Sequence, residues 1–109
     1  MSELTTLDLL TLAALADQAR YGYELVQRIE ELTDARISIR PGNLYRVLHR
    51  LMERGLVVET ETARVAGADE RRRYFRTTAR GRKVAAEELA MYQRVLKRTP
   101  ALKELLSNV

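Results

Sequence analysis

One segment near the middle of this sequence has both of its ends marked, and it constrains the fold more than any other feature. Pro41 suits the first position of a helix because its missing N–H would have no partner there, and Gly55 is typical of the left-handed residue that follows a helix. Between them, apolar residues recur at intervals of three and four, at Leu44, Val47, Leu48, Leu51 and Met52. We therefore predict an amphipathic helix over residues 41–54 whose apolar stripe faces the core.

Two helices are expected before this one. Thr5 or Thr6 can cap the first, which covers residues 7–15 and is apolar on nearly all sides, so it should lie at the centre of the core. A polar break at residues 17–20 then leads to Tyr21-Gly22-Tyr23 and to a second periodic run. That run carries Leu25, Val26, Ile29 and Leu32 at helical spacing. The first half of the chain is therefore expected to hold three helices in succession.

Beyond Gly55 the pattern changes to that of strands and then back to that of a helix. Residues 56–62 and 73–77 are β-prone, and the small and Arg-rich residues between them indicate a long hairpin loop. Thr78 can cap a long final helix, Pro100 closes or kinks it, and one more short apolar-faced turn follows. We predict a mainly α fold with a small β-hairpin. Residues 1–78 would form a winged helix-turn-helix, and residues 79–109 a long C-terminal helix.

Positive charge is concentrated in the middle of the chain. The 109 residues carry a net charge of +4, but residues 36–83 alone hold 13 basic and 5 acidic side chains, and nearly all of the basic ones are Arg. Arg suits bidentate contacts to phosphate and to guanine. This clustering favours an anionic polymer as the partner over an ordinary solvated surface.

The composition disfavours several other classes of protein. The chain lacks cysteine, which removes disulfides, thiolate metal sites and thiol nucleophiles and fits a reducing cytoplasm. It has one histidine, no glycine-rich phosphate loop and no metal-ligand pair at usable spacing, so we expect neither an enzyme nor a cofactor or metal site. Neither a signal peptide nor a membrane-spanning run is apparent. We therefore expect a soluble cytoplasmic protein that does not act at a membrane.

The polar face of the helix predicted at residues 41–54 is the first candidate binding surface. Asn43, Arg46 and Arg50 lie opposite the apolar stripe, and Tyr45 and His49 flank it. A helix of this length fits the major groove of DNA, where Arg can pair with guanine and Asn with adenine. We expect Asn43, Arg46 and Arg50 to contact DNA, with Arg40 just before the helix. The alternative is an ordinary solvated helix face.

Two neighbouring segments point to the same partner. The start of the second helix could bring free backbone N–H groups and the phenols of Tyr21 and Tyr23 to a phosphate, with Gly22 permitting a close approach. Core packing is the alternative, more so for Tyr23 than for Tyr21. The hairpin loop adds four arginines that could reach phosphates or the minor groove, at Arg64, Arg71, Arg72 and Arg73.

Four motifs, in this order and spacing, resemble the PadR family of transcriptional regulators. They are residues 21–25 (YGYEL), 41–51 (PGNLYRVLHRL), 55–57 (GLV) and 73–82 (RYFRTTARGR), within a match of about residues 5–83. The resemblance implies a winged helix-turn-helix, a homodimer built through the C-terminal helix, and repression at an inverted-repeat operator. It places phosphate-contacting and base-reading roles on Tyr23, Asn43, Tyr45, Arg46 and the wing arginines. The chain departs from the family pattern at Thr77, where a larger apolar residue is more usual.

The C-terminal segment carries an apolar stripe that the small winged part has little room to cover. A second copy of the chain is the simplest cover, through Val84, Leu89, Tyr92, Val95, Leu96, Leu102, Leu105 and Leu106. The alternative is a helix that folds back on its own domain. The family's short members often respond to small molecules, for which Met91 and Tyr92 would line a site here, but residues of this kind at helical spacing are more often simple interface packing.

A winged domain that binds other proteins instead of DNA is the main functional alternative. The Arg-bearing face of the helix at residues 41–54 discriminates between the two, because a protein adaptor has no DNA contact to lose when Arg46 or Arg50 is removed. We therefore expect a homodimeric, sequence-specific regulator of transcription, with double-stranded DNA as its partner.

Overall fold

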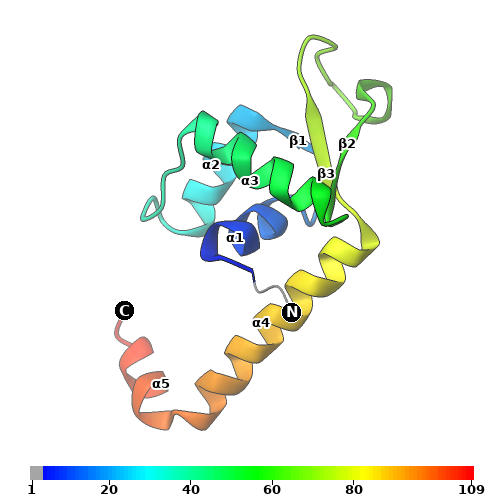
Figure 1. The fold of residues 1–109 in the computed structure, drawn as a ribbon. Coiled ribbons are helices and arrows are strands. Elements are labelled where there is room, and N and C mark those ends of the chain that lie inside the picture. The colour runs from blue at the N-terminus through cyan, green and yellow to red at the C-terminus, as the bar shows by residue number, and fades with distance from the viewer. Residues whose placement is uncertain (1–3) are drawn as a thin grey trace.

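The computed structural model describes residues 4–109 as a helical domain that carries a small sheet and a projecting helical arm (Figure 1). The elements, in chain order, are α1 (Thr6–Ala14), β1 (Arg20–Tyr21), α2 (Gly22–Leu32), α3 (Pro41–Glu53), β2 (Val57–Thr60), the 3-10 turn η1 (Thr62–Arg64), β3 (Tyr74–Thr77), α4 (Ala79–Arg98) and α5 (Pro100–Leu106). The strands form one antiparallel sheet in the order β1-β3-β2. The predicted mainly helical winged fold is confirmed.

The helix boundaries follow the signals read in the sequence. Thr5 caps α1, where its hydroxyl accepts a hydrogen bond from the Asp8 N–H at 3.1 Å. Pro41 is the first residue of α3, and Gly55 adopts a φ of +73° just after the helix, in the region that favours glycine. Thr78 caps α4 by accepting from the Gly81 N–H at 3.0 Å. Local chemistry therefore fixes each of these helix ends.

The sheet contains one strand more than the sequence predicted. The pair Arg20–Tyr21 forms β1 against β3, with Tyr21 opposite Tyr74, while β2 pairs with the other side of β3. A strand of two residues has no periodicity to detect, which is why it was missed. Figure 1 shows the β2–β3 hairpin and its long loop projecting from the helical domain as the wing.

The core of the winged domain lies where α1, α2, α3 and the sheet meet. Leu12, Leu25, Leu44 and Leu48 are fully buried there, together with Phe75 from β3. Thr77, which replaces the expected larger apolar residue, is also buried, and its hydroxyl donates to the Leu15 carbonyl at 3.4 Å. The departure at Thr77 is therefore accommodated by a hydrogen bond in the core.

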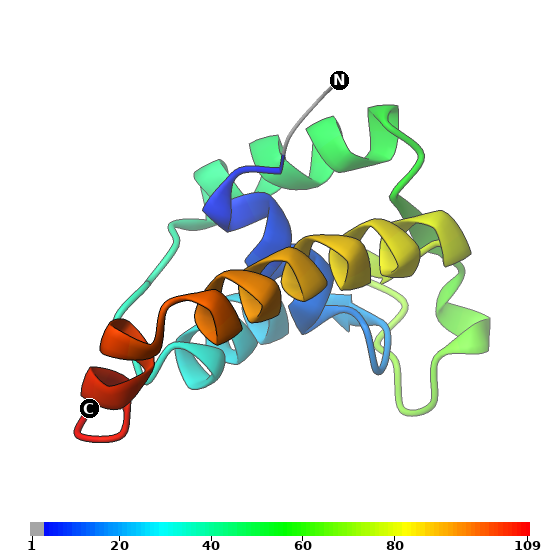
Figure 2. The same ribbon diagram turned by 90° about the horizontal axis from the view of Figure 1, so that it is seen from below.

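The arm formed by α4 and α5 begins inside this domain and ends outside it. At its start, Gly81 is buried so closely against the residue that precedes β2 that an added Cβ would lie 2.0 Å from the Leu56 carbonyl oxygen. The first half of α4 packs against α1, where Ala85 is buried and Val84 touches the core. Figures 1 and 2 show the rest of α4 extending past the domain and α5 turning in a new direction, and α5 begins at Pro100. The predicted interruption at Pro100 is confirmed.

Candidate nucleic-acid interface

The outer face of α3 is polar, basic and accessible. Leu44, Val47, Leu48 and Leu51 turn into the core, which leaves Asn43 and Arg46 exposed on the opposite side. Within residues 4–109, neither Arg46 nor the exposed Arg40, which precedes the helix, takes part in an ion pair. A cation without a carboxylate partner is available to an anionic ligand, so the face retains its positive charge.

Arg50, on the same face, has a partner that the sequence did not predict. Its guanidinium donates to the carboxylate of Asp8 on α1, which is 1% exposed. The nearby Arg54 lies 4.0 Å from the other Asp8 oxygen. Thr5-x-x-Asp8 is a recognisable capping box, but nothing in the sequence links it to a residue 42 positions later. Arg50 is thus engaged within the domain, unlike Arg46.

Tyr45 lies at the side of α3 that faces the wing. Its hydroxyl would be 2.9 Å from a Cβ added at Gly22, and its ring meets Phe75 edge-on with centroids 6.2 Å apart. The absent side chain of Gly22 therefore makes room for Tyr45, where the sequence suggested close approach to a phosphate. Tyr45 remains 41% exposed, so part of its ring is still accessible beside the polar face.

The two tyrosines on either side of the first residue of α2 take positions opposite to those favoured from the sequence. Tyr23 is 63% exposed, whereas Tyr21 is partly buried in β1 with its ring edge against Tyr74, at 5.5 Å between centroids. The N–H of Tyr21 donates to the Glu24 carboxylate at 3.2 Å and so is not free for a phosphate. Strand pairing explains the difference, because it fixes Tyr21 against the wing. Tyr23 therefore presents its phenol to solvent.

The four wing arginines are exposed, but each lies near a carboxylate. Arg71 is held by Asp69 at 3.0 Å, Arg73 by Glu59 at 2.8 Å, and Arg64 lies 3.8 Å from Glu61. Arg72 sits 4.2 Å over the ring of Tyr21 and 4.0 Å from Asp69. The sequence predicted that these four arginines could reach DNA, and in the folded wing a carboxylate lies near each of them.

These contacts also move pKa values. Hydrogen bonds from the side chain and then the backbone of Arg71 lower the pKa of Asp69, while the same contact raises the pKa of Arg71. Arg73 likewise has its pKa raised by its hydrogen bond to Glu59. All of these groups stay charged near neutral pH. The wing arginines therefore keep their positive charges while they are paired with these carboxylates.

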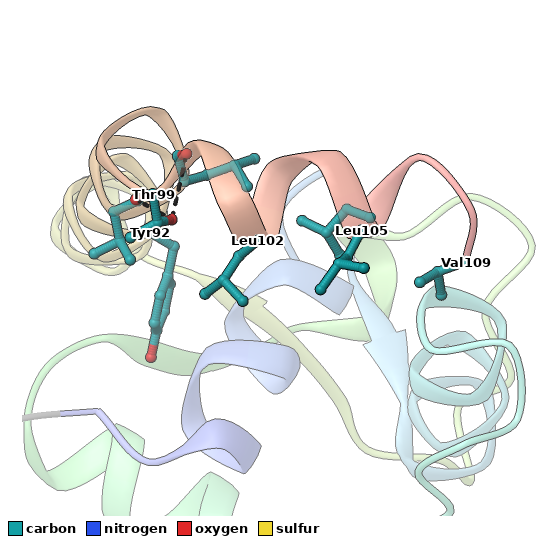
Figure 3. Close-up of a pocket in the computed structure, with 8 residues that line it drawn as sticks. Tyr92, Thr99, Leu102, Leu105 and Val109 are labelled. Atoms are coloured by element: carbon teal, nitrogen blue, oxygen red, sulfur yellow. Dashed lines mark hydrogen bonds between the residues drawn. The ribbon is translucent and has the colours of Figure 1, made fainter.

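A second candidate surface lies far from α3, in the angle between α4 and α5. Figure 3 shows Tyr92 from α4 beside Leu102 and Leu105 from α5, around an open groove of about 450 Å³. The groove is lined by Tyr92, Val95, Leu96, Thr99, Leu102, Leu105, Leu106 and Val109. Met91 is not part of this lining, so the two residues expected to share an effector site are separated. Val84, which was expected in the dimer interface, also lies outside this groove and is half-buried against the core of its own domain.

Two further observations concern membrane-spanning helices and grouped metal-ligating side chains. None of the helices within residues 4–109 is long and apolar enough to cross a membrane. Across the same residues, no three metal-ligating side chains are grouped as a metal site would require.

A polar recognition-type helix beside a β-wing defines a winged helix-turn-helix, a class of DNA-binding domain. The model of the PadR-like family of transcriptional regulators matches residues 11–87, which is most of the chain. The protein therefore belongs to the PadR-like family and is a DNA-binding transcriptional regulator.

Three individual proteins illustrate what this chain is similar to. A transcriptional regulator from Clostridium thermocellum is 26% identical, with a TM-score of 0.70 over 87% of each chain. A PadR family regulator from Clostridium difficile has the same fold, with a TM-score of 0.72, 19% identity and coverage of 90% of this chain and 98% of that one. An uncharacterized protein from Lysinibacillus sphaericus is 33% identical over 81 residues, which are 74% of this chain and 72% of the relative. The family is one of transcriptional regulators.

Proposed function

We propose that this chain acts as a homodimeric repressor that places the outer face of α3 in the major groove of an inverted-repeat operator. The observation that carries the proposal is the exposed, unpaired guanidinium of Arg46 beside Asn43 on that face. Arg46 would read guanine and Asn43 adenine. Both residues lie in the N-terminal half of α3, the part of a recognition helix that reaches base edges.

The surfaces on either side of α3 would contact the DNA backbone. Tyr23 at the start of α2, Arg40 and the exposed part of Tyr45 border the reading face and would bind phosphates. The wing would contribute Arg64, Arg71, Arg72 and Arg73, with Tyr21 supporting Arg72 from below. When Arg71 or Arg73 binds a phosphate, it must first give up its ion pair with Asp69 or Glu59, so one ion pair replaces another. The wing contacts should therefore add less affinity than Arg40 or Arg46.

The dimer would form through the arm, so that residues 1–78 bind DNA and residues 79–109 bind a second copy. Support comes from the exposed apolar side chains of α4 and α5: Leu89, Tyr92, Val95, Leu102, Leu105 and Leu106 are each between 46% and 63% exposed. A contiguous apolar surface of this kind is typical of an interaction site. Twofold symmetry would set the reading helices one duplex turn, roughly 34 Å, apart.

A ligand-responsive form of this proposal places an effector in the α4–α5 groove. Its volume of about 450 Å³ falls within the range of small-molecule sites, and Tyr92 offers a ring on which a planar apolar compound could stack. Such a ligand would compete with, or alter, packing of the partner subunit. Its signature would be a change in DNA affinity that Tyr92→Ala abolishes.

Selection of genomic DNA fragments bound by the purified protein tests the function directly. We expect recovered fragments to share a pseudo-palindrome with half-sites one helical turn apart. Arg46→Ala should weaken binding and relax base preference by about 1–3 kcal/mol at one position of each half-site. Arg94→Ala on α4 is the matched control, because it removes the same charge from an exposed helix outside the reading face.

Two outcomes would count against the proposal. If the protein binds no duplex better than a neutral protein does at low ionic strength, the α3 face is not a DNA surface, and the adaptor alternative gains. If DNA binds but Arg46→Ala leaves the base preference unchanged, DNA binding stands and the assignment of Arg46 fails.

A further inference from the structure

We infer that Arg50 is a positioning residue that fixes the orientation of the reading helix by way of Asp8, and that it does not contact DNA itself. The inference rests on the proposed function, because it concerns how α3 is presented to the major groove. It changes the role expected for Arg50 from the sequence. Asp8, which no motif singled out for binding, becomes the second member of the device.

The geometry around Asp8 shows why the pair can hold one helix against another. The carboxylate lies in the first turn of α1, where Oδ2 accepts from the Thr5 N–H at 3.0 Å and Oδ1 accepts from Arg50 on α3. Its position is therefore set by its own helix before Arg50 binds. A carboxylate fixed at one end and paired at the other acts as a strut between α1 and α3.

Burial makes this contact hard to exchange for a phosphate. Asp8 is 1% exposed, so an Arg50 side chain that left for DNA would leave a charged carboxylate inside the protein, with the Thr5 N–H at 3.0 Å and Arg54 at 4.0 Å in partial compensation. Breaking a buried pair on one side costs far more than breaking a surface pair. Arg71 and Arg73, whose carboxylate partners are much more exposed, face no such penalty.

The strut lies next to the residues that would read DNA. Arg46 is one helical turn before Arg50 on the same face of α3, and Asn43 lies nearly one turn before that. These three side chains line a shallow groove together with Thr5, Thr6 and Leu7 at the start of α1. A change in the angle between α1 and α3 would therefore shift both Asn43 and Arg46 relative to the bases. Misplacement of about 1 Å is enough to weaken paired hydrogen bonds.

The test compares Asp8→Asn, Arg50→Gln and the double variant in the full-length protein. The probes are two duplexes of about 30 base pairs, long enough for two half-sites: the best sequence from a random-library selection, and a scrambled version of it. Affinities are measured over a series of salt concentrations. Arg94→Gln, which removes a charge from α4, is the control, and circular dichroism with urea unfolding sets a temperature at which every variant is folded.

We expect both single variants to lose about tenfold in discrimination between the two duplexes, with the double variant no worse than either. In Arg50→Gln, the dependence of affinity on salt should match that of wild type, because no phosphate contact is lost. Arg94→Gln should keep full discrimination. The isosteric Asp8→Asn is decisive, since it removes the pair but leaves Arg50 free to bind DNA.

Three results would overturn the inference. A salt slope lowered in Arg50→Gln by about 0.9 per subunit would show a direct phosphate contact. Undiminished discrimination in Asp8→Asn would show that the pair does not position α3, and lowered stability with unchanged discrimination would give the pair a purely structural role. In each case wild-type binding and the effect of Arg46→Ala stay intact, which separates this failure from failure of the proposed function. A wild-type protein that binds neither duplex would overturn both.

Discussion

The winged domain and the helical arm treat similar residues in opposite ways. In the domain, leucines such as Leu12, Leu25 and Leu48 are fully buried, whereas on the arm Leu102 and Leu105 are more than half exposed. α5 contains no buried residue at all. The domain thus buries its apolar side chains within itself, whereas the apolar side chains of the arm stay exposed and could contact another molecule. A domain can be stable alone, but an exposed apolar face of this size indicates a binding partner.

The sharpest way to break this contrast is to disturb the point where the arm leaves the domain. In Gly81→Ala the new Cβ would overlap the Leu56 carbonyl oxygen, which also accepts from the Thr78 N–H at 3.1 Å and so cannot easily move. We expect a loss of about 3 kcal/mol in the free energy of unfolding, measured by urea denaturation. Gly42→Ala is the matched control. It has open space around its Cβ and should stabilise α3 by about 0.5–1 kcal/mol.

A substitution on the arm should weaken the proposed dimer and leave the stability of the domain unchanged. Val95→Asp places a carboxylate in the groove between α4 and α5, where the proposed second copy would bury it. We expect the dimer dissociation constant to rise about thirtyfold, or about 2 kcal/mol, in sedimentation equilibrium.

The same change should leave the winged domain folded, as judged by its circular dichroism. Gln93→Asp, exposed on the same helix but absent from the groove, is the control and should leave the dimer intact. A monomeric wild-type protein would contradict the proposed dimer. A Val95→Asp dimer as tight as the wild-type dimer would show that the groove on the arm is not part of the interface.

A smaller effect is expected at the junction itself. Thr77 donates to the Leu15 carbonyl and accepts from Arg82 in the first turn of α4 at 3.3 Å, so its hydroxyl joins the domain to the arm. Thr77→Val keeps the shape and removes both bonds, which should cost about 1 kcal/mol in urea unfolding. Thr60→Val in β2, where the structure gives the hydroxyl no bond, is the control. Equal stabilities for the two variants would show that the buried hydroxyl contributes nothing.

The two regions also differ in how much the sequence could predict. The ends of the helices could be predicted because Thr5, Pro41, Gly55 and Thr78 act on their immediate neighbours. The apolar stripes of α2 and α3 and the break at Pro100 could be predicted for the same reason. Periodicity could not, however, say which part of the α4 stripe was covered. Val84 and Ala85 pack into the core of the winged domain, whereas Val95 is 50% exposed.

The candidate site shows the same limit. The outer face of α3 followed from helical geometry, so Asn43 and Arg46 lie where the sequence placed them. Contacts between distant segments did not follow, because no local pattern encodes them. Asp8 with Arg50, and Tyr21 with Tyr74, join residues more than 40 positions apart. A sequence gives the sign of a charge but not its partner.

The wing lies between the two extremes, because it is exposed like the arm but held by its own ion pairs. Hydrogen bonds from Arg71 lower the pKa of Asp69, so their small contribution to wing order is present above the ordinary pKa of an aspartate and disappears as the pH falls through the lowered value. We expect an NMR titration to find the Asp69 carboxyl below its usual range, and Arg71→Ala to return it towards that range. Asp17, whose pKa is lowered by Arg20, serves as the internal control and should titrate alike in both proteins. If Arg71→Ala does not move the pKa of Asp69, Arg71 is not paired with Asp69 and is as free as Arg46 on the outer face of α3. The wing should then bind phosphate as strongly as Arg46 does.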